Sequence, residues 1–388
     1  MNRSRVVRTL LISNFFMGVG FNIWMAVFNN FAVEELGIGA AQMGILQSVR
    51  ELPGVLGFAT SYLALFASEL SLASLSVVGT GLGLALMGLA TGMVSLLVYL
   101  MIFSTGFHIY HPASSAVALM ESEGKETPRL LGRMGSVNAA AAVLATAFVY
   151  FAVAPLGFRY TLILSGLVTA LGGLFCLRSG RRVQTRQKQE KVVFRARYWV
   201  FYALTFLMGS RRHIFSTFAI FLLVENYRIP AQATAVLFLA SSLLVTYVAN
   251  LQGKLVAQLG ERVTMTGYFI TIVLICVGYA YVSWLPLLYV LFVGDSVMAG
   301  FGIAVNSYFR KIASAAEVTA NMSMSQTINH ISALFVPAVG GLMWERLGFQ
   351  STFLFGAVVA TICLVVTQWM RVAPEPAVPA VEGASSAT

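Results

Sequence analysis

Long apolar stretches alternate with short polar ones along almost the whole chain. Runs of about 20 apolar residues are long enough to cross the hydrocarbon core of a bilayer as a helix. Such runs occupy approximately residues 7–33, 40–66, 71–91, 94–118, 131–153, 158–178, 198–224, 231–257, 263–283, 285–308, 320–343 and 349–371. Lipid-exposed backbone must satisfy its own hydrogen bonds, so each run is expected to be helical. The pattern predicts an all-α polytopic membrane protein with twelve transmembrane helices.

The composition supports this prediction. The chain has 388 residues, of which 58% are hydrophobic and only 10% are charged, whereas soluble domains carry about a quarter charged residues. Its first residues, Met1 to Arg5, lead directly into an apolar run without a small-residue cleavage site. This start predicts a retained first helix and not a signal peptide. A soluble fold is therefore excluded.

The basic residues lie mostly in loops between the apolar runs. When both termini are placed inside the cell, most of the 25 Lys and Arg residues fall on the cytoplasmic side, and external loops hold only Arg159, Arg228 and Arg346. This asymmetry follows the positive-inside rule. It predicts a multi-pass protein of the cytoplasmic (inner) membrane with both termini in the cytoplasm. It also accounts for the net charge of +10 without a nucleic acid as partner.

An internal repeat divides the chain near its middle. The sequence LGFRYT at Leu156–Thr161 recurs as LGFQST at Leu347–Thr352, and the same offset carries Asn138 onto Asn329. Parallel repeats with a site between them at the membrane midplane are a transporter architecture. The predicted domains are a six-helix bundle at 1–178, a basic cytoplasmic linker at 179–197, a second six-helix bundle at 198–371 and a disordered cytoplasmic tail at 372–388.

Together these features resemble the major facilitator superfamily, whose members are secondary transporters. The family's loop signature, Gly-x-x-x-Asp-x-x-Gly-x-Arg, is matched by Gly253, Gly260 and Arg262, with Ala257 at the aspartate position. The family uses this loop to latch one state, so the resemblance gives these residues a structural or gating role. Among the branches of the family, the chain is most similar to the proton-coupled drug and metabolite group. The resemblance implies that helices 1, 4, 7 and 10 line a central cavity.

Two adjacent arginines lie at the centre of the seventh apolar run. Charges at this depth are costly, so Arg211 and Arg212 predict ionic partners or a water-filled cavity. Neighbouring residues are about 100° apart on a helix, so at most one can point squarely into the cavity. Arg212 is the first choice as a substrate-binding residue, opposite Asn22 and on one stripe with Phe215, because a guanidinium suits carboxylate or phosphate. The alternative is a structural ion pair with Asp295.

Two carboxylates inside apolar runs are the candidates for proton coupling. Asp295 is the only aspartate of the chain and lies in helix 10; it either carries a proton or pairs with helix 7. Glu51 follows Arg50 in helix 2, a side helix on which either residue could pair with its neighbour or with helix 11. Because adjacent residues do not face each other on a helix, each of the two is expected to have another partner. Arg50 is expected to be structural.

All four histidines lie inside apolar runs. His108 and His111 share one polar stripe of helix 4 with Ser104 and Ser115, which predicts contact with substrate or transfer of protons. Histidines at i and i+3 can begin a metal site, but no carboxylate or cysteine lies one turn away, so no metal site is predicted. The other residues predicted at the site are substrate-binding Asn306 and structural or gating His213, Asn329 and His330.

The predicted function is secondary active transport of a small organic solute, anionic or zwitterionic, by alternating access with proton coupling. The alternatives are efflux of amphipathic drugs by proton antiport and, less favoured, transport of a metal ion or metal chelate. The sequence contains neither a Walker A loop nor a zinc-protease or nucleophile motif, which argues against a primary pump and against an enzyme. The expected partners are substrate, protons and lipid. No cofactor is expected, and the protein is expected to be a monomer.

Overall fold

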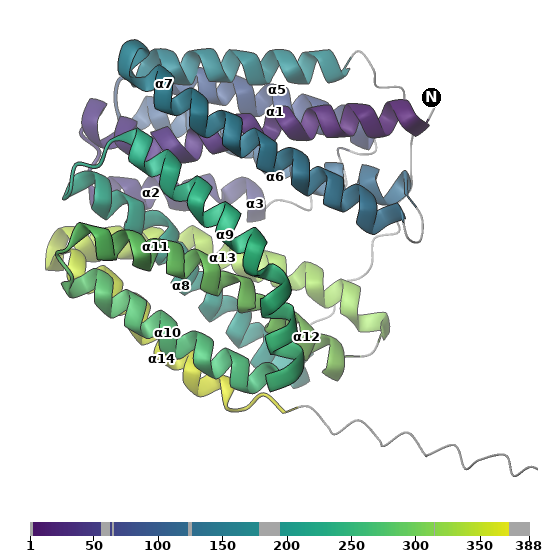
Figure 1. Ribbon diagram of the computed structural model, residues 1–388, viewed down its shortest axis with the longest axis vertical. Coiled ribbons are helices and arrows are strands. Elements are labelled where there is room, and N and C mark those ends of the chain that lie inside the picture. The colour runs from purple at the N-terminus through teal and green to yellow at the C-terminus, as the bar shows by residue number, and fades with distance from the viewer. Residues whose placement is uncertain are drawn as a thin grey trace, which may run out of the picture.

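The computed structural model describes residues 3–55, 63, 66–122, 126–177, 195–313 and 315–371, and all regular structure within these ranges is helical (Figure 1). The principal helices are α1 (Arg3–Asn30), α2 (Ala40–Arg50), α3 (Leu52–Val55), α5 (Glu69–Met87), α6 (Met93–Met120), α7 (Glu126–Leu177), α8 (Trp199–Glu225), α9 (Ala231–Leu259), α10 (Glu261–Tyr281), α11 (Leu285–Ala299), α12 (Ile303–Ile312), α13 (Ala315–Leu347) and α14 (Phe349–Thr367). The predicted linker up to residue 194, residues 56–62 of the second predicted span and the tail from residue 372 lie outside the described ranges.

The helices account for the twelve predicted spans. Ten continuous helical stretches of the described chain are long and apolar enough to cross a membrane. One of them, α7, is two spans in sequence, because Gly157 adopts the non-helical angles φ 72° and ψ 173° within it. The remaining span, predicted at 40–66, is described as α2 and α3 as far as Val55.

The repeat has a structural counterpart in the turns between its last two helices. Gly157 breaks α7, and Gly348, at the equivalent place in the LGF sequence, separates α13 from α14. Both glycines have positive φ, 72° and 87°, a conformation that L-residues with a Cβ rarely adopt. The same short sequence therefore makes the same turn in both halves.

Each half packs mainly on itself. The helices α1, α5, α6 and α7 contact one another in the upper part of Figure 1, and α8, α10, α13 and α14 do so in the lower part. The halves meet where α2 packs on α13 and where α9 packs on α1 and α7. At the first of these contacts Gly44 faces the backbone at Pro337, and Gly341 faces the backbone at Ala40. Small residues let the helix backbones approach closely here, as is usual between helices in membranes.

Hydrogen bonds between the halves cluster toward the end of the molecule where α1 stops. The Asn30 side chain donates to the Ile229 carbonyl over 2.7 Å, and the Thr234 hydroxyl lies 3.4 Å from Asn30 Oδ1. Closer to the middle, the Ala338 amide donates to Ser48 Oγ over 3.0 Å. We refer to this end as the joined end and to the opposite end, where α1 begins, as the N-terminal end.

Candidate functional site: a charged cluster between the two halves

Glu51 lies at the centre of a buried polar cluster. It is 5% exposed and sits in a turn between the end of α2 at Arg50 and the start of α3 at Leu52. Its carboxylate forms an ion pair with the guanidinium of Arg50, which also lies over the Trp24 ring at 5.1 Å from its centroid. Pairing with the neighbour, which the sequence left open, is present because the helix is interrupted at Glu51 and the helical spacing rule does not apply across the interruption.

Two histidines from other helices complete the cluster. Glu51 Oε2 is 3.0 Å from His330 Nδ1 on α13 and 3.5 Å from His108 Nε2 on α6. The further partner expected for Glu51 is therefore present, and it comes from both halves of the chain. A Cβ at Gly54 would lie only 2.7 Å from His108 Cδ2 and would also contact the His330 ring. Glycine at this position leaves room for both imidazoles.

The hydrogen bonds of His108 fix where its proton lies. Its Nδ1 is 2.9 Å from the Ser104 carbonyl and 3.0 Å from Ser104 Oγ, whose own proton points to the carbonyl of Arg50. Two acceptors therefore face Nδ1, and this nitrogen carries the proton of the neutral ring. The unprotonated Nε2 then faces the Glu51 carboxylate as a second acceptor. One additional proton at this place converts a repulsive contact into a hydrogen bond.

The same three residues have the ligand types of a transition-metal site. One donor atom from each of Glu51, His108 and His330 lies within 4.8 Å of the others, and two imidazoles with a carboxylate suit such an ion. The sequence shows no carboxylate one turn from the histidines. In the structure Glu51, which is distant from them in the chain, supplies it. The Arg50 guanidinium already neutralises Glu51, however, and its charge opposes a divalent cation. The cluster is therefore less suited to a divalent cation than its three ligand types alone suggest.

The second intramembrane ion pair has a different setting. Arg211 of α8 pairs with Asp295 of α11 and donates to the Tyr268 hydroxyl of α10 over 3.0 Å. Arg211 is 1% exposed and Asp295 is 7% exposed. All three residues belong to the second half. The sequence offered an ion pair with helix 7 as the alternative to a proton-carrying role of Asp295. This ion pair is present in the structure.

Arg212 points away from this pair. Its side chain is exposed and donates to Asn329 Oδ1 over 3.2 Å, and Asn329 directly precedes His330 of the cluster. Of its predicted stripe, Phe215 is buried against Tyr279 and Phe292, so this ring is core and not accessible surface. Arg212 is thus the accessible arginine of the two, and its partner Asn329 is the chain neighbour of His330 in the Glu51 cluster.

The other predicted residues differ in their exposure and in their hydrogen-bond partners. Asn22 is half-buried and donates to its own helix at Gly18, while His111 and Asn306 are exposed. His213 is buried, Gly260 ends α9 with φ 77°, and Arg262 donates to Gln368. Sequence reasoning missed Phe107, whose ring packs against His108 and His111 with centroids 5.3 and 4.6 Å apart. A phenylalanine within an apolar run carries no distinguishing signal.

A helical chain of this apolarity, with two repeats around a charged cluster where they meet, defines a membrane transporter. The chain belongs to the Major Facilitator Superfamily, whose sequence profile matches residues 10–316. This confirms the resemblance seen in the sequence and the expectation that the protein is a transporter and not an enzyme. The sequence matches no curated protein.

Solved structures of transporters share this fold. The nucleoside transporter NupG is 14% identical, with a TM-score of 0.76 over 95% of this chain and 99% of that one. A bacterial homologue of the human lysosomal transporter Spinster, in an inward-facing and occupied conformation, is 13% identical, with a TM-score of 0.77 over 95% and 96%. A bacterial homologue of the iron transporter ferroportin, in an inward-facing state, is 15% identical, with a TM-score of 0.75 over 95% and 99%. At these identities the similarity concerns the fold alone.

Proposed function

We propose that the protein couples the movement of a small organic anion or zwitterion to that of a proton, and that the proton is carried by the cluster of Arg50, Glu51, His108 and His330. One observation carries this proposal: the Glu51 carboxylate contacts an imidazole from each half of the chain. A proton that binds there changes a contact between the halves, which are the bodies that move in alternating access. Residues 1–178 and 198–371 are proposed as these two bodies.

The charge balance of the cluster favours transport of the anion and proton together. Arg50 and an ionised Glu51 cancel each other, so a proton on either histidine leaves one net positive charge. Arg212 adds a second positive charge close by through its contact with Asn329. An anion bound at Arg212 therefore binds more tightly when the cluster is protonated, and by linkage the proton binds more tightly when the anion is present. This reciprocity describes symport.

The proposed orientation places both termini in the cytoplasm, so that the joined end faces outward and Arg212 is reached from the inside. The protein would then lie in the cytoplasmic membrane and work as a monomer. Asp295, the other predicted proton carrier, is proposed to serve mainly as the structural partner of Arg211, because both members of that pair lie within one half.

The test is solute flux in proteoliposomes with an imposed pH gradient, first with small carboxylates and phosphorylated compounds and then with cationic dyes. Symport predicts that an anion accumulates on the alkaline side and that Glu51→Gln abolishes this accumulation. It also predicts that this variant still exchanges labelled for unlabelled anion across the bilayer. Dye movement that Arg212→Ala leaves unchanged would instead favour efflux of amphipathic compounds. Anion flux that is independent of the pH gradient would overturn the coupling.

A further inference from the structure

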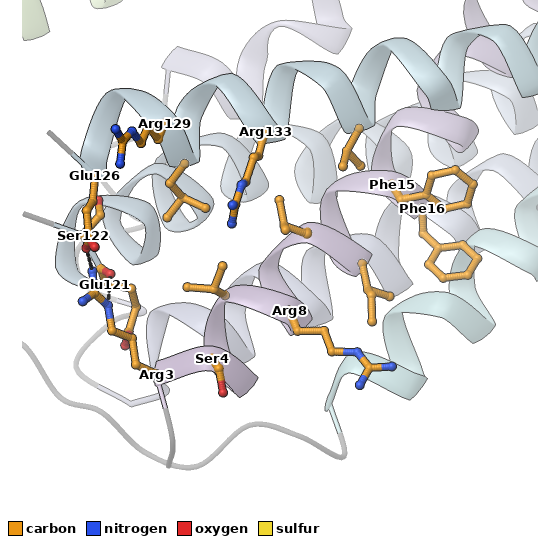
Figure 2. Close-up of a pocket in the computed structure, with 15 residues that line it drawn as sticks. Arg3, Ser4, Arg8, Phe15, Phe16, Glu121, Ser122, Glu126, Arg129 and Arg133 are labelled. Atoms are coloured by element: carbon orange, nitrogen blue, oxygen red, sulfur yellow. Dashed lines mark hydrogen bonds and ion pairs between the residues drawn. The ribbon is translucent and has the colours of Figure 1, made fainter.

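A large cavity lies apart from the charged cluster, at the N-terminal end of the first half. It has a volume of about 860 Å³ and is enclosed by the start of α1, the end of α6 and the start of α7 (Figure 2). We call it the basic groove and define it by Arg8, Arg129 and Arg133 at its mouth and by Leu11, Ile12 and Phe15 along its floor. Neither the fold nor the proposed coupling mechanism requires these residue types here.

Glu121 and Glu126 also line the basic groove, but neither forms an ion pair with its three arginines among the residues that the structure describes. Arg3, nearby, is satisfied by Glu126 and by the carbonyl of Glu121. Arg8, Arg129 and Arg133 are exposed and make no ion pair or hydrogen bond within the part of the chain that the structure describes. Figure 2 shows Arg133 extending from α7 toward α1 across the space between the two helices. Positive charges held around one space in this way favour an anion.

The floor of the basic groove is apolar and follows one face of α1. Leu11, Ile12 and Phe15 come three, four and seven residues after Arg8, the spacing of neighbours on one helical face. From Arg8 to Phe15 this face is roughly 10 Å long at the usual helical rise. The groove thus changes from charged near the helix ends, at the level of the membrane surface, to apolar toward the membrane interior. A free solute anion would leave this apolar part unused.

We propose that the basic groove binds one anionic phospholipid of the surrounding leaflet. Its head group lies at the charged end of the groove, between Arg129 and Arg133 on α7 and Arg8 on α1, and an acyl chain lies along Leu11, Ile12 and Phe15. The polarity gradient of the groove then matches the order of head group and chain in the bilayer, and basic pockets between transmembrane helices are known to suit such head groups. Because α1 and α7 are also the helices of the first half that contact α9, the lipid is placed to influence how the two halves close.

The experiment measures lipid binding to the full chain, purified in detergent, by native mass spectrometry. Phosphatidylglycerol, phosphatidylcholine and water-soluble glycerol phosphate are titrated separately. Phosphatidylglycerol is expected to bind at least tenfold more tightly than phosphatidylcholine. Each arginine near the membrane surface contributes about fivefold in affinity, so Arg129→Ala with Arg133→Ala weakens binding by about 25-fold. The matched control is Arg310→Ala, which removes one exposed charge outside the groove at the end of α12.

Three further results distinguish a bound lipid from a solute anion. Ile12→Asn places a polar side chain on the floor of the groove. We expect it to weaken the binding of phosphatidylglycerol several-fold and to leave the affinity for glycerol phosphate unchanged. The assignment is overturned if the double arginine variant binds phosphatidylglycerol as the wild type does. It is also overturned if glycerol phosphate displaces the lipid at equal concentration, because the groove then recognises a solute anion alone. Thermal unfolding of each variant confirms that the fold is retained. Solute flux is not measured here, so the outcome is independent of the coupling mechanism.

Discussion

The two intramembrane ion pairs contain the same chemical groups in different surroundings. Arg211 and Asp295 lie within the second half and are almost fully buried, and Arg211 also donates to the Tyr268 hydroxyl. Arg50 and Glu51 lie where the halves meet, and Glu51 also contacts two histidines. The first pair therefore stays together in any arrangement of two rigid halves, whereas the second loses the His330 contact when the halves separate. We propose that the position of a charge relative to the contact between the halves, more than its burial, decides whether it takes part in coupling.

The largest effect on stability is expected from removing the charge of Asp295. Asp295→Asn leaves Arg211 buried without a counterion, which costs about 3–5 kcal/mol of stability. We expect a large fall in the midpoint of thermal unfolding, measured on the detergent-solubilised protein. The double variant Arg211→Met with Asp295→Leu removes both charges and is expected to recover most of this loss. If the double variant unfolds as early as the single one, the pair is not the cause.

Glu51→Gln is expected to affect transport more than stability, in contrast to Asp295→Asn. The neutral amide can still accept a hydrogen bond, and the Arg50 side chain is 17% exposed, against 2% for Arg211, and keeps its contact with Trp24. We therefore expect a smaller loss of stability than in Asp295→Asn. Proton-driven uptake should fall at least tenfold, a loss of about 1.4 kcal/mol or more in coupling. Exchange across the membrane, which needs no net proton movement, should continue. Glu345→Gln, on an exposed site near the end of α13, is the matched control and should leave both activities unchanged.

Arg212→Ala tests whether the accessible arginine of α8 recognises the solute. Loss of a charge-assisted contact of this kind is worth about 1.5–3 kcal/mol, so KM for the anion should rise tenfold or more while unfolding stays near that of the wild type. Arg212→Lys should recover part of the affinity, because the charge returns without the bidentate geometry. Arg346→Ala, exposed at the joined end, is the control. An unchanged KM in both Arg212 variants would remove Arg212 from the site.

The fold could be predicted from the sequence because its determinants are local. Apolar runs of membrane-crossing length indicate the spans, and the repeated LGF sequence indicates equivalent turns, which the structure shows as the positive φ of Gly157 and Gly348. The pairing of Arg211 with Asp295 was also foreseeable, because Asp295 is the only aspartate that an intramembrane arginine could meet.

The charged cluster was predictable only in part, because it depends on contacts between distant segments. Glu51, His108 and His330 were each chosen as candidates, but no spacing along the chain indicates that they meet. The sequence left open whether Arg50 and Glu51 pair with each other, and they do so because the helix is interrupted there. Pro53 and Gly54, which follow after Leu52, are residues that commonly end or break helices. They were the local signal that the helical spacing rule should not be applied across this position.

Ser104→Ala gives the smallest expected effect and tests the proton assignment of His108. Ser104 contacts no solute in the proposed mechanism; its hydroxyl and carbonyl hold Nδ1–H, so that Nε2 faces Glu51. The carbonyl remains in the variant, and loss of one hydrogen bond of about 1 kcal/mol predicts roughly fivefold weaker proton-driven uptake at most. A positioning role requires that the dependence of uptake on pH shifts while the KM for the anion at saturating proton concentration does not. Ser114→Ala removes a comparable hydroxyl from the same helix, which bonds to the His111 carbonyl and to the Tyr110 hydroxyl, and should shift neither. A change of KM alone in Ser104→Ala would mean that the hydroxyl acts on the solute site and that the orientation of His108 is fixed by the backbone.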